Sequence, residues 1–302
     1  MRCRPNVEEA PAHPDAGGRR GYIVSWSERI GEVGVWRGAA DVDAALAAEI
    51  EGLGFGAIWL GGSPPSDLRA AEALLDATER IVVATGIVNI WKSSAEELAA
   101  SWQRIEARHP GRLLLGIGSG HREATPERVR PLAAMGAYLD VLDAGGVPVG
   151  ARVLSAMGPK SLTLAAERSA GTHPYLTVPS QSAEQRAALG AGALIAPEQT
   201  VVLDEDAARA RETARRFLAG YLNKANYVAS MQRAGFTGAD TDGAGSDRLV
   251  DEIVVHGSTA RIATAVRAHL EAGADHVCVQ VQPVAEPLET LRAIAGVLGL
   301  RG

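Results

Sequence analysis

Short apolar runs alternate with amphipathic helical patterns along this chain from Gly31 onward, and this alternation constrains the fold more than any other feature. Runs of this kind form the strands of parallel sheets, in which helices cover both faces. We interpret eight runs as strands, at residues 32–36, 57–60, 81–90, 112–117, 152–156, 175–178, 201–203 and 277–281. Eight such units favour a closed (β/α)8 TIM barrel of the α/β class, with an open doubly wound sheet as the alternative.

The predicted barrel occupies residues 21–302 as a single catalytic domain. Residues 1–20 are rich in Pro, Arg and Gly and lack the apolar segment of a signal peptide, so we expect a disordered leader. Residues 207–236 form a long helical insertion between the seventh and eighth strands. A connection of this length is typical of an active-site wall or lid.

Charge and cysteine content exclude several classes of function. The net charge is −6 over 302 residues, with both signs interspersed, so neither nucleic acid nor an anionic membrane is an expected partner. Two cysteines, and no run long enough to span a bilayer, favour a reduced, cytoplasmic protein without a disulfide framework. We expect a small-molecule substrate and a homodimer.

The carboxyl ends of the strands carry the chemistry of a TIM barrel, and the fourth strand ends in an unusual way. Its apolar run leads into Gly118, Ser119 and Gly120, which allow close approach of the backbone to a planar ring or a phosphate, although a plain tight turn has the same pattern. His121 follows directly and can exchange a proton near neutral pH, or it is merely a polar residue of the rim. His173 precedes the predicted sixth strand, so we expect it on the opposite face in a structural role.

Other strand ends carry weaker signals. Residues 156–160 combine a strand end, a helix N-terminus and a lysine, which suits an anion as well as a simple helix entry. Trp36, Trp59 and Trp91 end three strands, where they clamp a flat ring or pack in the core. The glycine at position 86, inside the third strand, indicates a bulge. The sequence has no metal-binding motif, nucleophile elbow or P-loop.

Several motifs together resemble the luciferase-like monooxygenase superfamily, in particular its deazaflavin (coenzyme F420)-dependent oxidoreductases. They include GVW at 34–36, VVATGIVNIW at 82–91, GRLLLGIGSGH at 111–121, RVLSAMGPKSLTLAAERSAG at 152–171 and AGADHVCVQV at 272–281.

The resemblance implies a flavin-like ring at the carboxyl ends of the strands. It implies a non-proline cis peptide at Gly86–Ile87 behind the ring, and phosphate contacts from the loop after the fourth strand and the helix after the fifth. The cofactor-binding residues implied are Trp59, Gly61, Thr85, Gly86, Ile87, Gly118, Ser119, Gly120, Ala156, Met157, Gly158, Pro159 and Lys160. This chain departs from the family where an Asp-His pair is replaced by Gly61-Gly62-Ser63, and where a histidine is replaced by Gln181.

We therefore expect hydride transfer between coenzyme F420 and a small organic substrate. His121 is the predicted proton donor or acceptor, with Asn89 beside it as a second catalytic residue. The predicted substrate-binding residues are Trp36, Trp91, Tyr227 and Gln282. Two alternatives remain: an FMN-dependent monooxygenase of the same fold, and a barrel that binds a cofactor without catalysis.

Overall fold

The parallel sheet at the centre of the molecule follows the predicted alternation. A computed structural model describes residues 25–121 and 130–302, so the predicted leader at 1–20 lies outside the described residues. The strands are β1 (Val33–Gly38), β2 (Ala57–Gly61), β3 (Val82–Thr85), β4 (Val88–Asn89), β5 (Leu113–Gly118), β6 (Arg152–Leu154), β7 (Gly171–Thr172), β8 (Leu194–Ile195), β9 (Glu198–Leu203), β10 (Val254–Gly257) and β11 (Val277–Val281).

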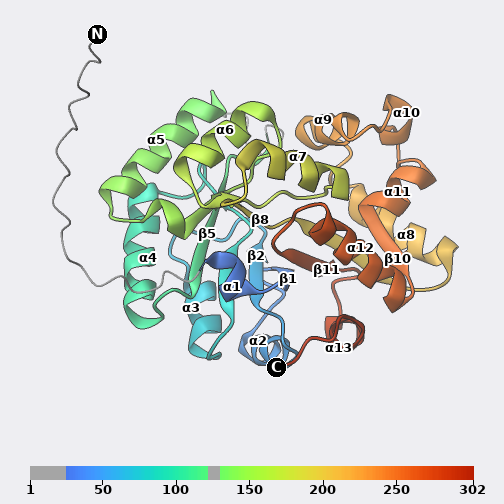
Figure 1. The fold of residues 1–302 in the computed structure, drawn as a ribbon, viewed down its shortest axis with the longest axis horizontal. Coiled ribbons are helices and arrows are strands. Elements are labelled where there is room, and N and C mark those ends of the chain that lie inside the picture. The colour runs from blue at the N-terminus through green and yellow to red at the C-terminus, as the bar shows by residue number, and fades with distance from the viewer. Residues whose placement is uncertain (1–24, 122–129) are drawn as a thin grey trace, which may run out of the picture.

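Helices surround this sheet, as Figure 1 shows. They are α1 (Trp26–Ile30), α2 (Ala44–Gly52), α3 (Arg69–Asp76), α4 (Ala95–Arg108), α5 (Pro131–Ala144), α6 (Pro159–Arg168), α7 (Pro179–Leu189), α8 (Ala207–Leu218), α9 (Ala225–Arg233), α10 (Gly238–Thr241), α11 (Asp247–Ile253), α12 (Thr259–Glu271) and α13 (Pro287–Leu298). Caps set several boundaries, because Ser94 and Ser258 accept hydrogen bonds from backbone N–H groups in the first turns of α4 and α12. Pro131, Pro159 and Pro287 each stand at a first helical position, where the missing N–H costs nothing.

The sheet curls round on itself into a barrel. Its strands are parallel, in the order β10-β9-β11-β1-β2-β3-β5-β6-β7-β8, with β4 also paired to β5. Only Ala196 and Pro197 separate β8 from β9. The two strands therefore form one extended segment, which pairs with β7 through Ile195 and with β11 through Glu198. The N–H of Cys278 also donates to the carbonyl of Pro197. The two ends of the sheet therefore meet, and the predicted α/β barrel fold is confirmed.

Three strands differ from the sequence prediction. The sixth barrel strand is β7 at Gly171–Thr172, whereas residues 175–178 form no strand. Leu176 has a φ of 55°, which a strand does not allow, and its N–H donates to the buried carboxyl of Glu198 instead of to a neighbouring strand. The prediction also missed β8, which pairs with β7, and β10, which adds to the outer edge of β9 after the helical insertion.

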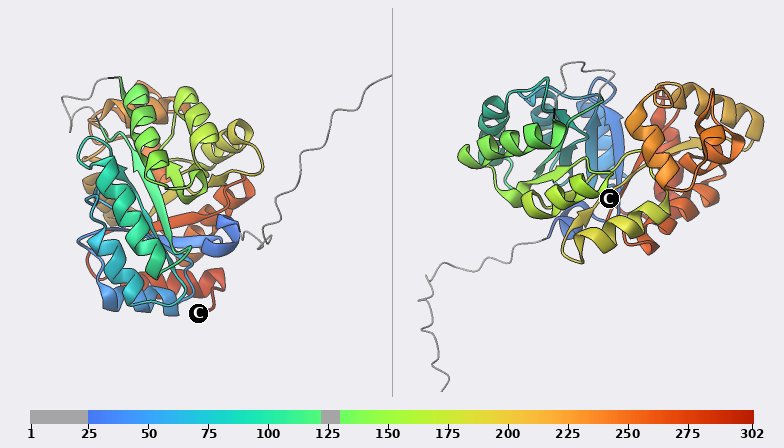
Figure 2. Two further views of the ribbon diagram at one scale, coloured as in Figure 1. Left: turned by 90° about the vertical axis from the view of Figure 1, so that its left-hand side faces the viewer. Right: turned by 90° about the horizontal axis from the view of Figure 1, so that it is seen from above.

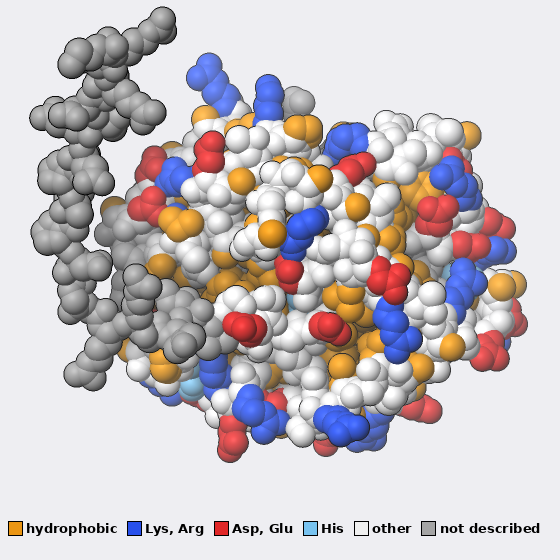
Figure 3. Space-filling view, in the orientation of Figure 1, with side chains coloured by type: hydrophobic (Ala, Val, Ile, Leu, Met, Phe, Trp, Pro, Cys, Tyr) orange, Lys and Arg blue, Asp and Glu red, His pale blue; other side chains and the backbone are white. Residues whose placement is uncertain are grey.

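The insertion between β9 and β10 places α8 to α11 on one side of the barrel mouth, as Figure 2 shows in orange in the right-hand view. Its helices pack around an apolar cluster, shared with the segment after β7, in which Leu218, Met231, Phe236 and Leu249 are buried. The face seen in Figure 3 carries Lys and Arg mixed with Asp and Glu, with apolar side chains between them. Within residues 25–121 and 130–302, no helix combines the length and apolarity that a membrane crossing requires.

Candidate functional site

One cavity of about 760 Å³ lies at the carboxyl ends of the strands, between the barrel and the insertion. The ends of β1, β4 and β5, the segment after β6, the start of α6, the segment after β7 and helix α9 all contribute side chains or backbone to it. This position is where βα-loops assemble the active sites of TIM barrels. Its volume falls within the range of sites for small ligands and cofactors, which is about 300–1,000 Å³.

The floor of the cavity is the break between β3 and β4. Gly86–Ile87 is a non-proline cis peptide, so the bond implied by the resemblance is present. A Cβ atom on Gly86 would lie 2.8 Å from Nε1 of Trp36 and 2.9 Å from Nε2 of His173, so only glycine fits this position. Gly86 and Ile87 both line the cavity. The predicted bulge thus presents a bare backbone with one apolar side chain.

The end of β5 forms one side of the cavity. Ser119, Gly120 and His121 line it, and Gly120 has a φ of 55° with no room for a Cβ beside the amide of Asn89. Asn89 also lines the cavity, and its Oδ1 accepts the N–H of Trp91 at 3.0 Å. These contacts hold the ends of β4 and β5 together, with the two predicted catalytic residues on the same side.

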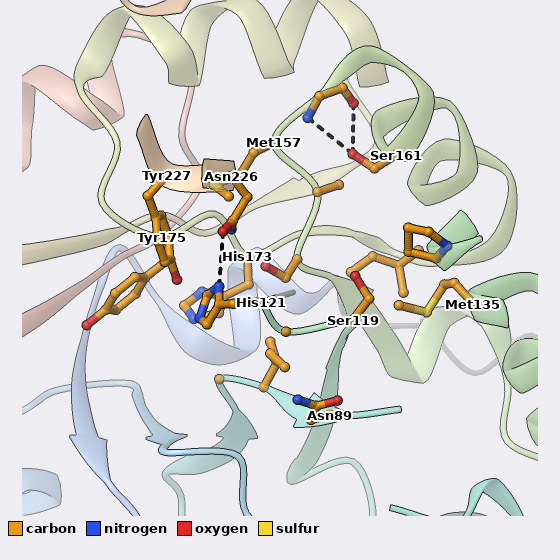
Figure 4. Close-up of a pocket in the computed structure, with 18 of the residues that line it drawn as sticks. Asn89, Ser119, His121, Met135, Met157, Ser161, His173, Tyr175, Asn226 and Tyr227 are labelled. Atoms are coloured by element: carbon orange, nitrogen blue, oxygen red, sulfur yellow. Dashed lines mark hydrogen bonds between the residues drawn. The ribbon is translucent and has the colours of Figure 1, made fainter. Parts of the chain in front are cut away.

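His121 reaches the insertion rather than the barrel interior. Its Nδ1 lies 3.2 Å from Oδ1 of Asn226, at the start of α9, and its ring lies 4.9 Å from the ring of Tyr227. Figure 4 shows the imidazole directed toward Asn226, with Tyr227 and Tyr175 nearby. The side chain is half-buried and lines the cavity, so its ring is accessible from there.

The start of α6 forms the opposite side. Residues 156–160 all line the cavity, and Ser161 caps the helix by accepting the N–H of Gly158 and donating to its carbonyl. Lys160 on this helix and Lys92 after β4 both line the cavity, and within the described ranges neither forms an ion pair. Two cations and a helix N-terminus suit an anionic group such as a phosphate.

Aromatic rings form the wall that faces the insertion. The ring of Tyr175 lies 5.3 Å from that of Trp36, 5.5 Å from that of Tyr221 and 6.0 Å from that of Tyr227. Tyr175 donates its hydroxyl proton to Gln280 at 2.7 Å. Burial raises the pKa values of Tyr175 and Tyr227 well above that of a free tyrosine, so both phenols stay neutral. This wall offers apolar, flat surfaces to a ligand.

His173 corrects the sequence prediction, which placed it on the opposite face of the barrel. It follows β7 directly, because this strand ends at Thr172, and it lines the cavity. Its ring stacks on Trp59 at 4.1 Å with an interplanar angle of 16°, and its Nδ1 donates to the carbonyl of Ala196 at 2.7 Å. Burial lowers the pKa of His173 to about 4, so the imidazole is neutral.

Six of the predicted binding residues do not line the cavity: Trp59, Gly61, Thr85, Gly118, Trp91 and Gln282. Trp59 is fully buried below the cavity, and its Nε1 donates to Nε2 of His276 at 3.1 Å. The side chains of a barrel strand alternate between the interior and the surrounding helices, and that of Trp59 lies in the interior. Trp91 points back and donates to the carbonyl of Ser119 at 3.0 Å.

The other four lie beneath or beside the lining residues. The hydroxyl of Thr85 donates to the carbonyl of Gly116 and accepts the N–H of the same residue. Gly61 lies under the ring of Trp36, and Gly118 lies against Ile87. Gln282 stands after β11 and donates its N–H to the carbonyl of Val201. These residues support the cavity without facing it.

Sequence reasoning missed several lining residues: Ser155, His173, Tyr175, Tyr221, Asn226 and Arg233. Arg233 ends α9 and donates to the carbonyl of Met157 at 3.0 Å, so it joins the insertion to the segment after β6. Tyr221 and Tyr227 lie close together in the sequence of the insertion, and this was the available signal for both. Nothing local in the sequence marks His173, because its exposure depends on where β7 ends.

The cavity residues fit a flavin-type cofactor. A flat ring requires a close, smooth floor, and Gly86 with Ile87 supplies one where no larger residue is accommodated. A phosphate on such a cofactor requires cations, and Lys92 and Lys160 supply them from two sides. Nε1 of Trp36 and Nε2 of His173 lie within 3 Å of the point where a Cβ atom of Gly86 would stand, so two ring nitrogens border the floor.

Comparison with known proteins gives the same family as the sequence motifs. Residues 32–145 match the family model of luciferase-like monooxygenases, so the predicted resemblance is confirmed. No curated protein matches the sequence of the chain.

Several solved structures share the fold. An F420-dependent secondary alcohol dehydrogenase, in complex with an F420-acetone adduct, superposes with a TM-score of 0.69 at 16% identity, over 88% of this chain and 98% of that one. The coenzyme F420-dependent tetrahydromethanopterin reductase of Methanopyrus kandleri gives 0.70 at 15% identity, over 89% and 99%.

A monooxygenase gives a similar match. The oxygenating constituent of 3,6-diketocamphane monooxygenase from Pseudomonas putida, in complex with FMN, gives 0.62 at 16% identity, over 89% and 97%. At these identities the neighbours establish the fold of the chain and not its cofactor.

Proposed function

We propose that this chain, whose residues 32–145 match the luciferase-like monooxygenase family, is an oxidoreductase that transfers a hydride between coenzyme F420 and a small organic substrate. The observation that carries the proposal is the cavity floor at Gly86–Ile87, with an imidazole on one side and two lysines around it. The two F420-dependent neighbours also superpose more closely than the FMN-bound monooxygenase.

The residues of the chain supply binding and proton control around the cofactor. A bound deazaflavin supplies a carbon atom that takes up or gives up a hydride. Gly86 and Ile87 would support its ring, and Lys92 and Lys160 would bind its phosphate. His121, held by Asn226, would exchange a proton with the substrate, because its half-buried ring is accessible both to the cavity and to water.

Asn89 acts by holding neighbouring groups in position. Its amide accepts the N–H of Trp91 and lies against Gly120, so it fixes the backbone that carries His121. We therefore assign Asn89 a positioning role and retain His121 as the catalytic residue.

A fluorescence titration with F420 and with FMN tests the cofactor. We expect F420 to bind the wild-type protein in the micromolar range and FMN to bind more weakly. Lys92→Ala and Lys160→Ala should each weaken F420 binding roughly tenfold, as expected for the loss of a charge-assisted hydrogen bond. Lys224→Ala is the matched control, because Lys224 bonds to the carbonyl of Gly220 and does not line the cavity.

Each of the other outcomes selects a different function. Tighter binding of FMN than of F420 would favour the monooxygenase alternative, which keeps the same floor. Tight binding of F420, without hydride transfer to a broad panel of alcohols, ketones and imines, would favour a barrel that binds a cofactor without catalysis. Absence of binding of both cofactors would contradict the proposal.

A further inference from the structure

The charged side chains that line the cavity are all cationic within residues 25–121 and 130–302. They are Lys92, Lys160 and Arg233, and no Asp or Glu of these ranges lines it. None of the three forms an ion pair with a described residue. A cavity with this charge favours an anionic ligand and disfavours an amine. The two lysines serve the cofactor phosphate in the proposed function, so Arg233 has no anion assigned to it.

The guanidinium of Arg233 stands where the insertion meets the barrel. Arg233 is the last residue of α9, and its Nη2 donates to the carbonyl of Met157 at 3.0 Å. Met157 in turn packs against the apolar cluster of the insertion, so this contact holds the exposed arginine at the edge of the cavity. A guanidinium has five N–H groups in a planar fork, and a carboxylate can accept two of them in parallel.

The same face of α9 carries the partner of His121. Asn226, Ala229 and Arg233 follow one another at intervals of three and four residues and all line the cavity, so they form one face of the helix. Asn226 contacts Nδ1 of His121, as Figure 4 shows. Because a helix rises about 1.5 Å per residue, the positions of Asn226 and Arg233 lie about 10 Å apart along the axis. The imidazole and the guanidinium therefore stand at opposite ends of one face.

The surface between these two ends carries no charge. Ala229 has only a methyl group and leaves room beside the helix, while Tyr227 and Met157 line the cavity next to it. Burial holds the pKa of Tyr227 well above that of a free tyrosine, so its phenol stays neutral. This stretch suits the apolar body of a ligand whose polar groups lie at its two ends.

We propose that Arg233 binds a carboxylate of the substrate, and that the substrate is an organic acid whose apolar body places the reacting carbon about 10 Å from that carboxylate. The inference rests on the proposed function, since it names the substrate class of the same cavity. The carboxylate site is distinct from the phosphate site, because Lys92 and Lys160 stand on the barrel, whereas Arg233 stands on the insertion with the partner of His121.

The test measures binding to the full chain by calorimetric titration, without cofactor or turnover. The probes are 8-hydroxyoctanoate and 8-hydroxyoctanamide, which share one chain and differ in charge. We expect the wild type to bind the acid about tenfold more tightly than the amide, the effect of a charge-assisted contact. Arg233→Gln should bind both equally, and Arg233→Lys should keep part of the difference, because a charge remains. Arg267→Gln is the matched control, since Arg267 also donates to one backbone carbonyl but lies outside the cavity.

Two further measurements locate the acid. Lys160→Ala should keep the preference for acid over amide, because the carboxylate binds at the insertion and not at the phosphate site. In protein labelled with ¹⁵N-histidine, 8-hydroxyoctanoate should shift the side-chain nitrogen signals of His121, which are identified by their loss in His121→Asn. 4-Hydroxybutanoate is too short to span the distance and should bind without shifting them.

The outcomes that overturn the inference are distinct from those that overturn the proposed function. Equal binding of acid and amide to the wild type would overturn it, as would a preference that disappears in Lys160→Ala. A loss of F420 affinity in Arg233→Gln as large as that in Lys160→Ala would also overturn it, because Arg233 would then bind the cofactor. A shift of the His121 signals by both acids would contradict the distance. Absence of F420 binding would overturn the proposed function alone, because the difference between acid and amide is measured without cofactor.

Discussion

The ends of β5 and β7 each place a histidine in the same cavity, but in opposite environments. His121, after β5, is half-buried and contacts Asn226 and the ring of Tyr227 on the insertion. His173, after β7, is buried, stacked on Trp59 and bonded to the backbone of β8–β9. Burial keeps the imidazole of His173 neutral, so it acts through hydrogen bonds: Nδ1 donates to the carbonyl of Ala196, and Nε2 carries a lone pair. The proposed function therefore assigns proton exchange to His121 and no proton transfer to His173.

The largest expected effect comes from the β5 side. His121→Asn should lower kcat by about 100-fold or more, because general acid–base catalysis contributes about 10²–10⁴-fold. The measurement is the pH profile of kcat with F420 and an alcohol. His109→Asn, at the end of α4 and outside the cavity, is the control. Unchanged turnover in His121→Asn would remove the proton-exchange role and with it the contrast between the two ends.

A single methyl group added to the cavity floor at Gly86 should affect the β7 side more than the β5 side. In Gly86→Ala the new Cβ would lie within 3 Å of the nitrogens of both Trp36 and His173, so these side chains must shift. We expect the affinity for F420 to fall by about 10- to 100-fold, which is the scale of overpacking in a filled site. Gly136→Ala on α5 is the control, since nothing lies within 4 Å of its added Cβ. Unchanged binding in Gly86→Ala would show that no ligand reaches the floor.

The pH dependence of stability should come from the β7 side as well. Glu198 accepts the N–H of Leu176 after β7, and burial raises the pKa of its carboxyl from 4.5 to about 8. Because the folded pKa is the higher one, the stabilisation is complete below about pH 4.5 and is lost as the pH rises through about 8. We expect the free energy of unfolding to fall by about 2 kcal/mol more between pH 6 and pH 8 in the wild type than in Glu198→Gln.

Denaturant titrations at the two pH values measure this difference. Glutamine keeps an oxygen for the N–H of Leu176 and cannot ionise, so the variant isolates the charge. An identical fall in both proteins would mean that Glu198 is ionised throughout, in contradiction to its burial.

The smallest effect should come from the partner of His121. Asn226→Ala removes the contact to Nδ1 but keeps the imidazole, so kcat/KM should fall by about three- to tenfold, the value of one neutral hydrogen bond. Combined with His121→Asn it should cause no further loss, because the two side chains act as one unit. Additive losses in the double variant would instead place Asn226 in contact with the substrate.

The sequence predicted the β5 side better than the β7 side, and the reason is local. The run at 112–117 is a buried strand that leads directly into glycines, so the position of His121 at the barrel mouth followed from the pattern alone. The region after β7 has no such pattern, because β7 has only two residues and the apolar run that follows is coil. That error of a few residues moved His173 to the wrong end of the barrel.

The resemblance to a family supplied what periodicity did not, namely the cis bond at Gly86–Ile87 and the place of the cavity. It did not place Trp59 correctly, because whether a side chain at a strand end faces the cavity or the barrel interior depends on one residue of register.

The sequence by itself determined the parallel barrel, the helical insertion and the glycines at positions 86 and 120, because burial periodicity and backbone conformation are local properties. The tertiary structure alone decided that Trp36 and His173, 137 residues apart in a chain of 302, bring their ring nitrogens to one point beside Gly86. Closure of the sheet brings the ends of β1 and β7 together across the barrel mouth, and no pattern of neighbouring residues encodes that contact.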